Sequence, residues 1–146
     1  MATYPKLISD KKNPLKVSKW FEKANEEIQF AYWVPNVSGG LVITMLPMDT
    51  DYGIEANIKY AKDAEATGFA TALCQTRWFA SYGADHQHEA FTIANALLQH
   101  TTTLEQITAV HPGLWHPAIV AKMQASLDVV SGGRTSINVV SGWFKG

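Results

Sequence analysis

Four short segments of the chain are rich in β-branched and aromatic residues, and they alternate with longer segments in which apolar residues recur every three or four positions. Short runs of this kind are typical of buried strands, whereas the wider spacing is typical of helices with one apolar face. The sequence predicts strands over residues 28–34, 69–74, 104–110 and 135–140. Turn-forming pairs, Pro35-Asn36 and Ser141-Gly142, follow the first and the last of them.

Three helices are predicted between these strands. The first begins after Asp51, a good capping residue, and ends before Gly68. The second covers residues 90–98. The third begins at His116-Pro117 and ends at Gly132-Gly133, since proline suits a first helical turn. The predicted apolar faces are Ile54, Ile58 and Ala61 in the first helix, Ala90, Ile93, Ala94, Leu97 and Leu98 in the second, and Ile119, Met123, Leu127 and Val130 in the third. A further short helix is predicted over residues 17–28.

Alternation of single strands with single helices predicts a parallel sheet, because a helix must carry the chain back between neighbouring strands. Two α/β architectures have this pattern. One is an open doubly wound sheet, and the other is part of an eight-stranded barrel, which takes about 250 residues. The periodicity leaves both open.

The amino-acid composition excludes several classes of function. The 146 residues carry a net charge of -1, and 47% of them are hydrophobic. A net charge so close to zero provides no basic surface that would bind nucleic acid. No apolar run reaches the roughly 18 residues that a membrane-spanning helix needs. A basic, proline-containing extension over residues 1–27 lacks the apolar segment of a secretory signal. The single cysteine, Cys74, favours a reducing compartment, and we expect a cytoplasmic protein.

Common cofactor and metal motifs are absent from the sequence. It contains no GxGxxG, GxxxxGK[ST] or GxSxG. His86 and His88 lie beside acidic residues, but in a loop that runs into a helix residues i and i+2 point apart. We therefore expect a solvated helix start there and no metal site. Cys74 ends a strand without a neighbour that lowers its pKa, so we interpret it as a core residue.

Polar, uncharged residues recur where the predicted strands end. In one parallel sheet these positions lie at the same edge, where α/β proteins bind ligands. The set comprises Pro35, Asn36, Gln75, Thr76, His111, Asn138 and Ser141, interleaved with Trp33, Trp78, Phe79, Tyr82, Trp115 and Trp143. Such a lining suits a flat aromatic ligand with polar edges better than a phosphate ester or a metal, and a flavin ring fits this description.

Several longer motifs resemble the flavin-dependent, luciferase-like monooxygenase family. They are "FAYWVPNVSGGLV", "HPGLWHPAIVAKMQASLDVVSGGR" and "INVVSGWFKG". "AYWVPNVSGG" and "SGWFKG" resemble the dimethyl sulfone branch, whose relatives act on alkanesulfonates. The resemblance covers residues 28–146 and leaves 1–27 as an extension. It implies a (β/α)8 TIM barrel, of which this chain supplies about four β/α units, the N-terminal half of the domain.

The same resemblance implies a function and a cofactor. FMN would bind as FMNH2, supplied by a separate NAD(P)H-dependent reductase, and O2 would oxidise a small organosulfur substrate. Dimethyl sulfone would give methanesulfinate and formaldehyde; an alkanesulfonate is the other substrate class. The chain would act with its missing C-terminal half or as a homo-oligomer. Two alternatives stay open: a non-catalytic fragment or interaction remnant of the fold, and a deazaflavin-dependent oxidoreductase.

Site residues follow from the resemblance position by position. Gln75 and Thr76 fall near the flavin contact after the second strand, and His111 falls at the end of the third strand. Asn138 and Ser141 match an N-x-V-[ST] element on the fourth strand. The alkanesulfonate branch has a cysteine in the loop after the second strand, and this chain has none there, so no catalytic residue is assigned.

Overall fold

The computed structural model describes residues 28–41, 44, 46–77 and 84–141, and within them four strands alternate with three helices. The elements are β1 (Ala31–Trp33), α2 (Ile54–Ala66), β2 (Thr71–Cys74), α3 (Ala90–His100), β3 (Glu105–Val110), α4 (Pro117–Ser131) and β4 (Thr135–Val139). The predicted strands and helices are confirmed, with β1 three residues long. The expected helix before the first strand lies almost entirely outside the described residues.

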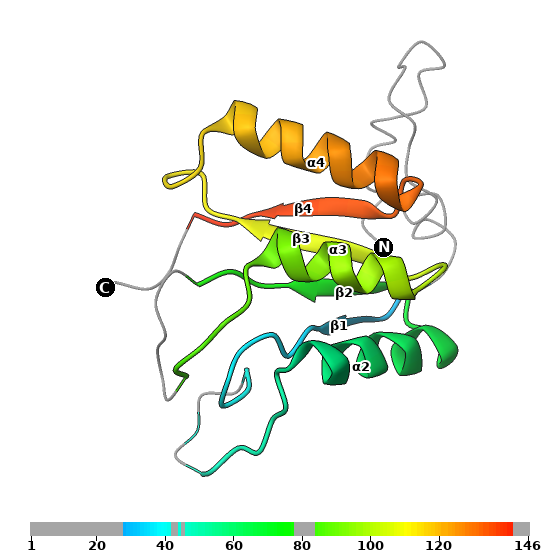
Figure 1. The fold of residues 1–146 in the computed structure, drawn as a ribbon, viewed down its shortest axis with the longest axis vertical. Helices are drawn as coiled ribbons and strands as arrows, with labels where there is room; N and C mark the ends of the chain where they lie inside the picture. Colours follow the sequence, from blue (N-terminus) through cyan, green and yellow to red (C-terminus); the bar gives the residue numbers. More distant parts are fainter. Residues whose placement is uncertain (1–27, 42–43, 45, 78–83, 142–146) are drawn as a thin grey trace.

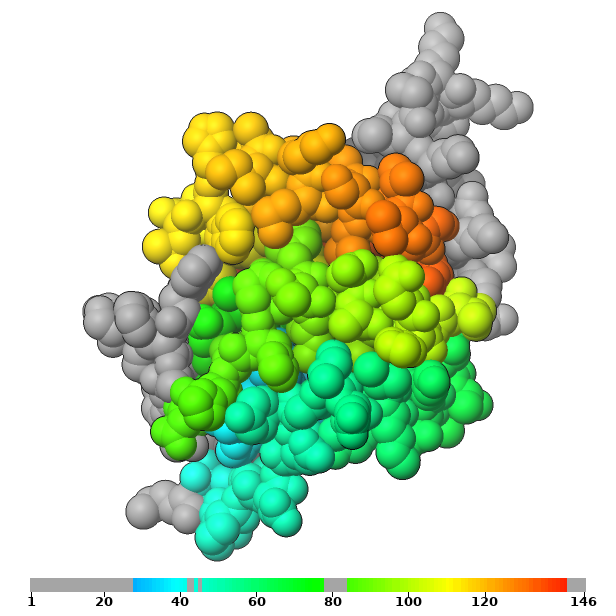
Figure 2. Space-filling model, in the orientation of Figure 1, coloured from blue at the N-terminus to red at the C-terminus, as the bar shows by residue number. Residues whose placement is uncertain are grey.

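All four strands are parallel, and their order in the sheet follows the chain, β1-β2-β3-β4. The three helices lie on one face of this sheet (Figure 1), and Figure 2 shows them covering that face side by side. A doubly wound sheet reverses its strand order and carries helices on both faces. Neither feature is present among the described elements. The arrangement is that of consecutive units of a β/α barrel, which decides between the two predicted architectures.

The core lies between the sheet and the helices. Alternate strand residues, Val34, Ala72, Cys74 and Val110, point toward the helices and are almost fully buried. They meet the apolar faces of α2 and α3, and the faces predicted for Ile58 and Ala61 in α2 and for all five residues of α3 are confirmed. Ile54, by contrast, is 42% exposed.

The predicted apolar face of α4 is partly wrong. Met123 and Leu127 do pack on the core, but Ile119 and Val130 are 51% and 61% exposed. Val120 packs on the core, and Ser131 is buried at the end of the helix. Because α4 has apolar residues on more than one side, spacing alone did not show which stripe faces the sheet.

The helix ends mostly follow the predicted chemistry. His116 Nδ1 accepts a hydrogen bond from the backbone N–H of Ala118 (3.2 Å), so His116 caps α4 as expected. Gly132 ends α4 with a φ of 70°, which glycine adopts without strain. Asp51 is not the capping residue of α2: Gly53 occupies that position, and the Asp51 carboxylate accepts the Gly53 N–H at 2.8 Å.

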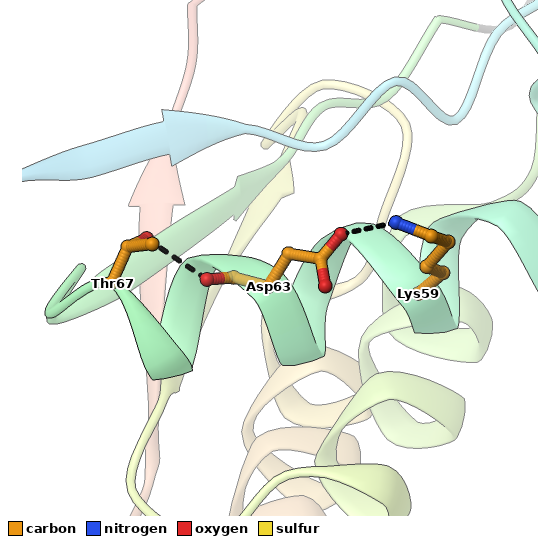
Figure 3. Close-up of polar contacts among 3 residues, drawn as sticks. All are labelled: Lys59, Asp63 and Thr67. Atoms are coloured by element: carbon orange, nitrogen blue, oxygen red, sulfur yellow. Dashed lines mark hydrogen bonds and ion pairs between the residues drawn. The ribbon is translucent and has the colours of Figure 1, made fainter.

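The outward face of α2 is charged. Lys59 and Asp63 form an exposed ion pair one turn apart, and the Thr67 hydroxyl donates to the Asp63 carbonyl at the end of the helix (Figure 3). The carboxylate of Asp63 raises the pKa of Lys59 by hydrogen bonding and by its charge. Exposed pairs of this kind contribute little to stability, so α2 depends on its buried face.

Two polar side chains hold the amino-terminal edge of the sheet. Arg134 donates to the carbonyls of Leu98, Leu104 and Ser131 and to the Thr101 hydroxyl, which ties the end of α3 to the start of β3 and β4. Glu65, near the end of α2, holds the turn before β3. One of its carboxylate oxygens accepts the backbone N–H groups and hydroxyls of that turn, which are contributed by Thr102, Thr103 and Leu104.

The pKa of Glu65 reflects this turn. Partial desolvation opposes ionisation, but the hydrogen bonds from Thr103, Leu104 and Thr102 together outweigh it and lower the pKa to about 2, from an ordinary 4.5. The folded state therefore stabilises the carboxylate form. This stabilisation is fully present above about pH 4.5 and is lost as the pH falls toward 2.

Replacing Glu65 with Gln should lower the free energy of unfolding by about 1 kcal/mol at pH 7, because a neutral amide binds the turn less strongly and the site is partly solvated. Urea unfolding from pH 7 to pH 2.5 should show the difference between wild type and Glu65→Gln shrinking below about pH 4.5. Glu55→Gln, on the exposed side of α2, is the matched control. A difference that stays constant over the whole range would contradict the assigned role of the carboxylate.

Candidate functional site

The carboxyl ends of the four strands lie at one edge of the sheet, because the strands are parallel and in register. Gln75 and Thr76 follow β2, His111 follows β3, and Ser141 follows β4 closely. Asn138 lies within β4 and pairs with Ala109 of β3. The predicted residues therefore do share one edge, but their side chains differ in how they are held.

Asn36 joins the ends of the first two strands. Its side chain is fully buried, and its Nδ2 donates to the carbonyls of Gln75 and His88, each at 3.1 Å. The Gln87 Nε2 donates to the same Gln75 carbonyl at 3.1 Å. Val37 and Gln87 also form an antiparallel bridge. Three segments far apart in the sequence thus meet at the end of β2, and we call Asn36, Gln75 and Gln87 the amide cluster.

A second layer supports the amide cluster from α2. Asn57 is fully buried and donates to the carbonyls of Pro35, Tyr52 and Gly53, at 3.3, 2.9 and 3.0 Å. The ring Nε2 of His88 lies 3.1 Å from the Tyr52 carbonyl. Because a carbonyl only accepts, this nitrogen must carry the proton. His88 therefore fixes the loop before α2, and its ring lies against that of Tyr52.

His86 also stacks on Tyr52, with ring centroids 6.2 Å apart. His86 is exposed and His88 is only half-buried, as residues in a loop before a helix commonly are. Within the described ranges no group of three or more His, Cys, Asp or Glu side chains is arranged to hold a metal ion. The expectation that the enzyme needs no metal stays a prediction.

Thr76 and His111 connect the ends of β2 and β3. The Thr76 hydroxyl donates to the Ala109 carbonyl at 3.1 Å. The His111 Nε2 lies 3.1 Å from the Thr76 carbonyl, so this nitrogen carries the proton and Nδ1 is the acceptor of the neutral ring. His111 is half-buried. The structure therefore brings Gln75, Thr76 and His111 together and orients the imidazole through the backbone of Thr76.

Asn138 and Ser141 are placed differently. Both are exposed, and they lie on or just after β4, which pairs with β3 alone among the described strands. The Val140 N–H donates to the Val110 carbonyl at 2.9 Å, so the backbone of this segment continues along β3. The backbone thus brings Asn138 and Ser141 to the correct edge of the sheet, but their side chains are not held against Gln75 or His111 in any contact within the described part.

The amide cluster holds several buried polar atoms that lack a hydrogen-bond partner among the described residues. They are the Asn36 Oδ1, the Gln75 Nε2 and the Gln87 Oε1. A buried polar atom left unpaired costs about 1–3 kcal/mol. The pyrimidine edge of a flavin carries two carbonyl oxygens with one N–H between them, so it can pair with the Gln75 Nε2 and with one of the two amide oxygens.

Sequence reasoning missed Gln87 and Asn57. Neither falls at a strand end, and their contacts join loops across the fold, so no spacing in the sequence points to them.

Cys74 is confirmed as a core residue, because it is fully buried. Burial, together with the nearby charge of Glu89, raises the pKa of its thiol. Trp115, which was expected among the aromatic residues near the strand ends, lies in a groove beside α4. Trp78, Phe79, Tyr82 and Trp143 lie outside the described residues.

The family model for luciferase-like monooxygenases matches residues 28–145. The chain belongs to the luciferase-like monooxygenase family. The resemblance of its motifs to this family is confirmed. No helix in the described ranges is both long and apolar enough to cross a membrane.

Two curated relatives are similar over 84% of this chain. The FMNH(2)-dependent dimethylsulfone monooxygenase of Pseudomonas putida is 53% identical over 122 residues, and that of Pseudomonas fluorescens (strain Pf0-1) is 50% identical over 123. The aligned part is 34% of each relative, so the chain spans about a third of their length. The predicted likeness to the dimethyl sulfone branch is therefore confirmed for the aligned residues.

A solved structure supports the fold alone. Riboflavin lyase (RcaE), determined with modified FMN and riboflavin, superposes with a TM-score of 0.67 at 21% sequence identity. The match covers 80% of this chain and 30% of the lyase. The luciferase-like fold class predicted from the sequence is confirmed.

Replacing Asn36 with Ala should lower the free energy of unfolding by about 1–3 kcal/mol, because the part-buried His88 carbonyl loses its side-chain donor and the loop before α3 loses one of its contacts with the segment after β1. Chemical denaturation monitored by circular dichroism measures the loss. Asn95→Ala, an exposed position on α3, is the control and should change stability by less than about 0.5 kcal/mol. Equal losses in the two variants would show that the amide cluster does not stabilise the carboxyl edge.

Proposed function

We propose that the chain forms strands one to four of an FMNH2- and O2-dependent monooxygenase that acts on a small organosulfur compound, dimethyl sulfone in the first instance. The observation that carries this proposal is the 53% identity to a relative named for that activity. Because the aligned segment is only a third of the relative, catalysis requires the remaining barrel units. The enzyme would work in the cytoplasm with a separate NAD(P)H-dependent reductase that supplies the reduced flavin.

Several described residues fit the flavin. The unpaired Gln75 Nε2 would donate to a ring carbonyl, and one of the two amide oxygens, the Asn36 Oδ1 or the Gln87 Oε1, would accept from the ring N–H between the carbonyls. His111, fixed by the Thr76 carbonyl, presents its remaining ring nitrogen as an acceptor. Asn138 and Ser141 would complete the contact from β4. Thr76 acts through the backbone, since its hydroxyl is already bound to the Ala109 carbonyl.

The bound flavin would supply the oxygen chemistry, and the protein would supply binding and orientation. None of the proposed contacts is a charged group. Neutral amides and an imidazole hold a planar ring without fixing a formal charge near it, and the fully buried Asn36 and Asn57 keep the loops around the ring rigid.

The activity can be tested with a chimera. This chain, joined to the part of the Pseudomonas putida relative that follows the matched segment, should release formaldehyde from dimethyl sulfone. Release should require FMN, NADH and a flavin reductase together. Omission of the reductase is the control. A chimera that folds and binds FMN, yet converts neither dimethyl sulfone nor a short alkanesulfonate, would contradict the proposed substrate class.

The flavin contacts can be tested in the same chimera by fluorescence titration. His111→Ala and Asn138→Ala should each weaken FMN binding by about 1–3 kcal/mol, since each leaves a polar edge of the ring unpaired. His100→Ala and Asn95→Ala, both exposed on α3, are matched controls and should bind FMN normally. Unchanged affinity in both test variants would remove these residues from the site. Tighter binding of FAD or of a deazaflavin than of FMN would contradict the choice of cofactor.

A further inference from the structure

The sheet has a second face, which the three described helices do not cover (Figure 1). Trp33 lies on this face, because its neighbours Tyr32 and Val34 pack on the helix-covered core and successive strand residues alternate between faces. Trp33 is the last residue of β1, at the carboxyl end of the strand, and it is 57% exposed. The largest side chain of the strand therefore lies outside the core, at the edge that holds the candidate site.

Trp33 belongs to a layer of residues that crosses the sheet. It pairs with Leu73 of β2, and Leu73 pairs with Ile107 of β3. Leu73 and Ile107 are half-buried. Ser136 of β4 pairs with Ile107 and ends the layer with a hydroxyl group. Because paired residues of neighbouring strands point to the same face, these four side chains form one uncharged and mainly apolar layer.

This layer lies directly beneath the polar groups of the candidate site. Gln75 of the amide cluster follows Leu73 by two residues, so it is one step nearer the carboxyl edge. On the two inner strands, the layer one step further from that edge consists of Thr71 and Glu105, which pair with each other and are 1% and 5% exposed. The apolar layer thus separates the amide cluster from a closed layer below it.

The width of a barrel gives the indole of Trp33 its importance. The interior of an eight-stranded barrel is just wide enough for side chains to fill it or to hold one small ligand. At the level of Trp33 a side chain as large as an indole takes much of that width. A ligand that lies against it beneath the flavin contacts must therefore be short. Uncharged apolar surface suits the methyl groups of a neutral sulfone, whereas a longer alkyl chain would collide with the indole.

We propose that Trp33 forms the floor of the organosulfur-binding pocket and limits the substrate to alkyl groups about as small as methyl, with Leu73 and Ile107 completing the apolar surface. This assignment rests on the proposed function, because it concerns the substrate of the same site. An indole that only packed on the rest of the barrel interior would affect stability and leave the choice between substrates unchanged. The two roles can therefore be separated by experiment.

The test measures chain-length selectivity in the chimera with the Pseudomonas putida relative. Trp33→Ala should raise the ratio of kcat/KM for dipropyl sulfone to kcat/KM for dimethyl sulfone at least about tenfold, because it opens space for further methylene groups in an apolar pocket. The change should appear mainly in KM. Trp33→Phe keeps an aromatic ring and should raise the ratio less.

Phe30→Ala is the matched control. Phe30 is 65% exposed, and its ring contacts Phe69, which packs on the helix-covered core, so it lies on the opposite face of the same segment. Phe30→Ala should keep the substrate ratio within twofold of wild type. Circular dichroism shows which variants keep the fold, and Trp33→Phe decides the question if Trp33→Ala does not fold.

Tryptophan fluorescence gives a second measurement that needs no turnover. Dimethyl sulfone should shift the emission of the FMN-loaded chimera to shorter wavelength, because the ligand displaces water from the exposed indole. Trp33→Phe should abolish this shift, and Trp115→Phe, in the groove beside α4, should retain it. A shift that depends on Trp33 without any turnover would support the assigned floor and count against the proposed function alone.

Three results would overturn the proposal. The first is a substrate ratio that stays unchanged in both Trp33 variants, whatever stability they lose. The second is an equal change of that ratio in Phe30→Ala. The third is an emission that dimethyl sulfone does not shift in the wild-type chimera, or shifts equally in Trp33→Phe.

Discussion

Parallel pairing of the strands is the constraint on which the rest of the molecule depends. Each helix must return the chain to the same edge of the sheet, so the connections at the two edges differ in length and in the side chains that hold them. At the amino edge the connections are short and are held by charged side chains, Glu65 and Arg134. At the carboxyl edge the connections are long and are held by neutral amides, Asn36 and Asn57. The charged contacts stabilise the fold at the edge that lies away from the proposed ligand.

Much of the fold was predictable because local and tertiary preferences agree. Short β-branched runs became strands, and a proline after His116 and a glycine after Ser131 mark the two ends of α4. The prediction was wrong where two nearby residues suited the same role equally well. Both Ile119 and Val120 fit an apolar stripe on α4, and only packing against the sheet selects Val120. Likewise, Asp51 and Gly53 both suit the start of α2, and Asn57 bonding to the Gly53 carbonyl favours the later start.

The candidate site was predictable to a smaller extent. Position at a strand end was enough to select Gln75, Thr76 and His111, which the structure brings together. It was not enough to find Gln87, which reaches the Gln75 carbonyl from a loop twelve residues further along the chain. Contacts of this kind leave no periodic trace in a sequence. Position also did not distinguish residues that neighbouring elements hold from residues, such as Asn138, that lie on an exposed edge strand.

This last difference divides the candidate site into two parts. Gln75 and His111 lie on inner strands and are already oriented, whereas Asn138 and Ser141 are exposed along β4. A strand that pairs with β4 would fix its backbone and desolvate its side chains, and hydrogen bonds to a ligand strengthen as water is excluded. On this view the amide cluster would supply a preformed part of the proposed ligand site, and the β4 contacts would become effective only once the edge is paired.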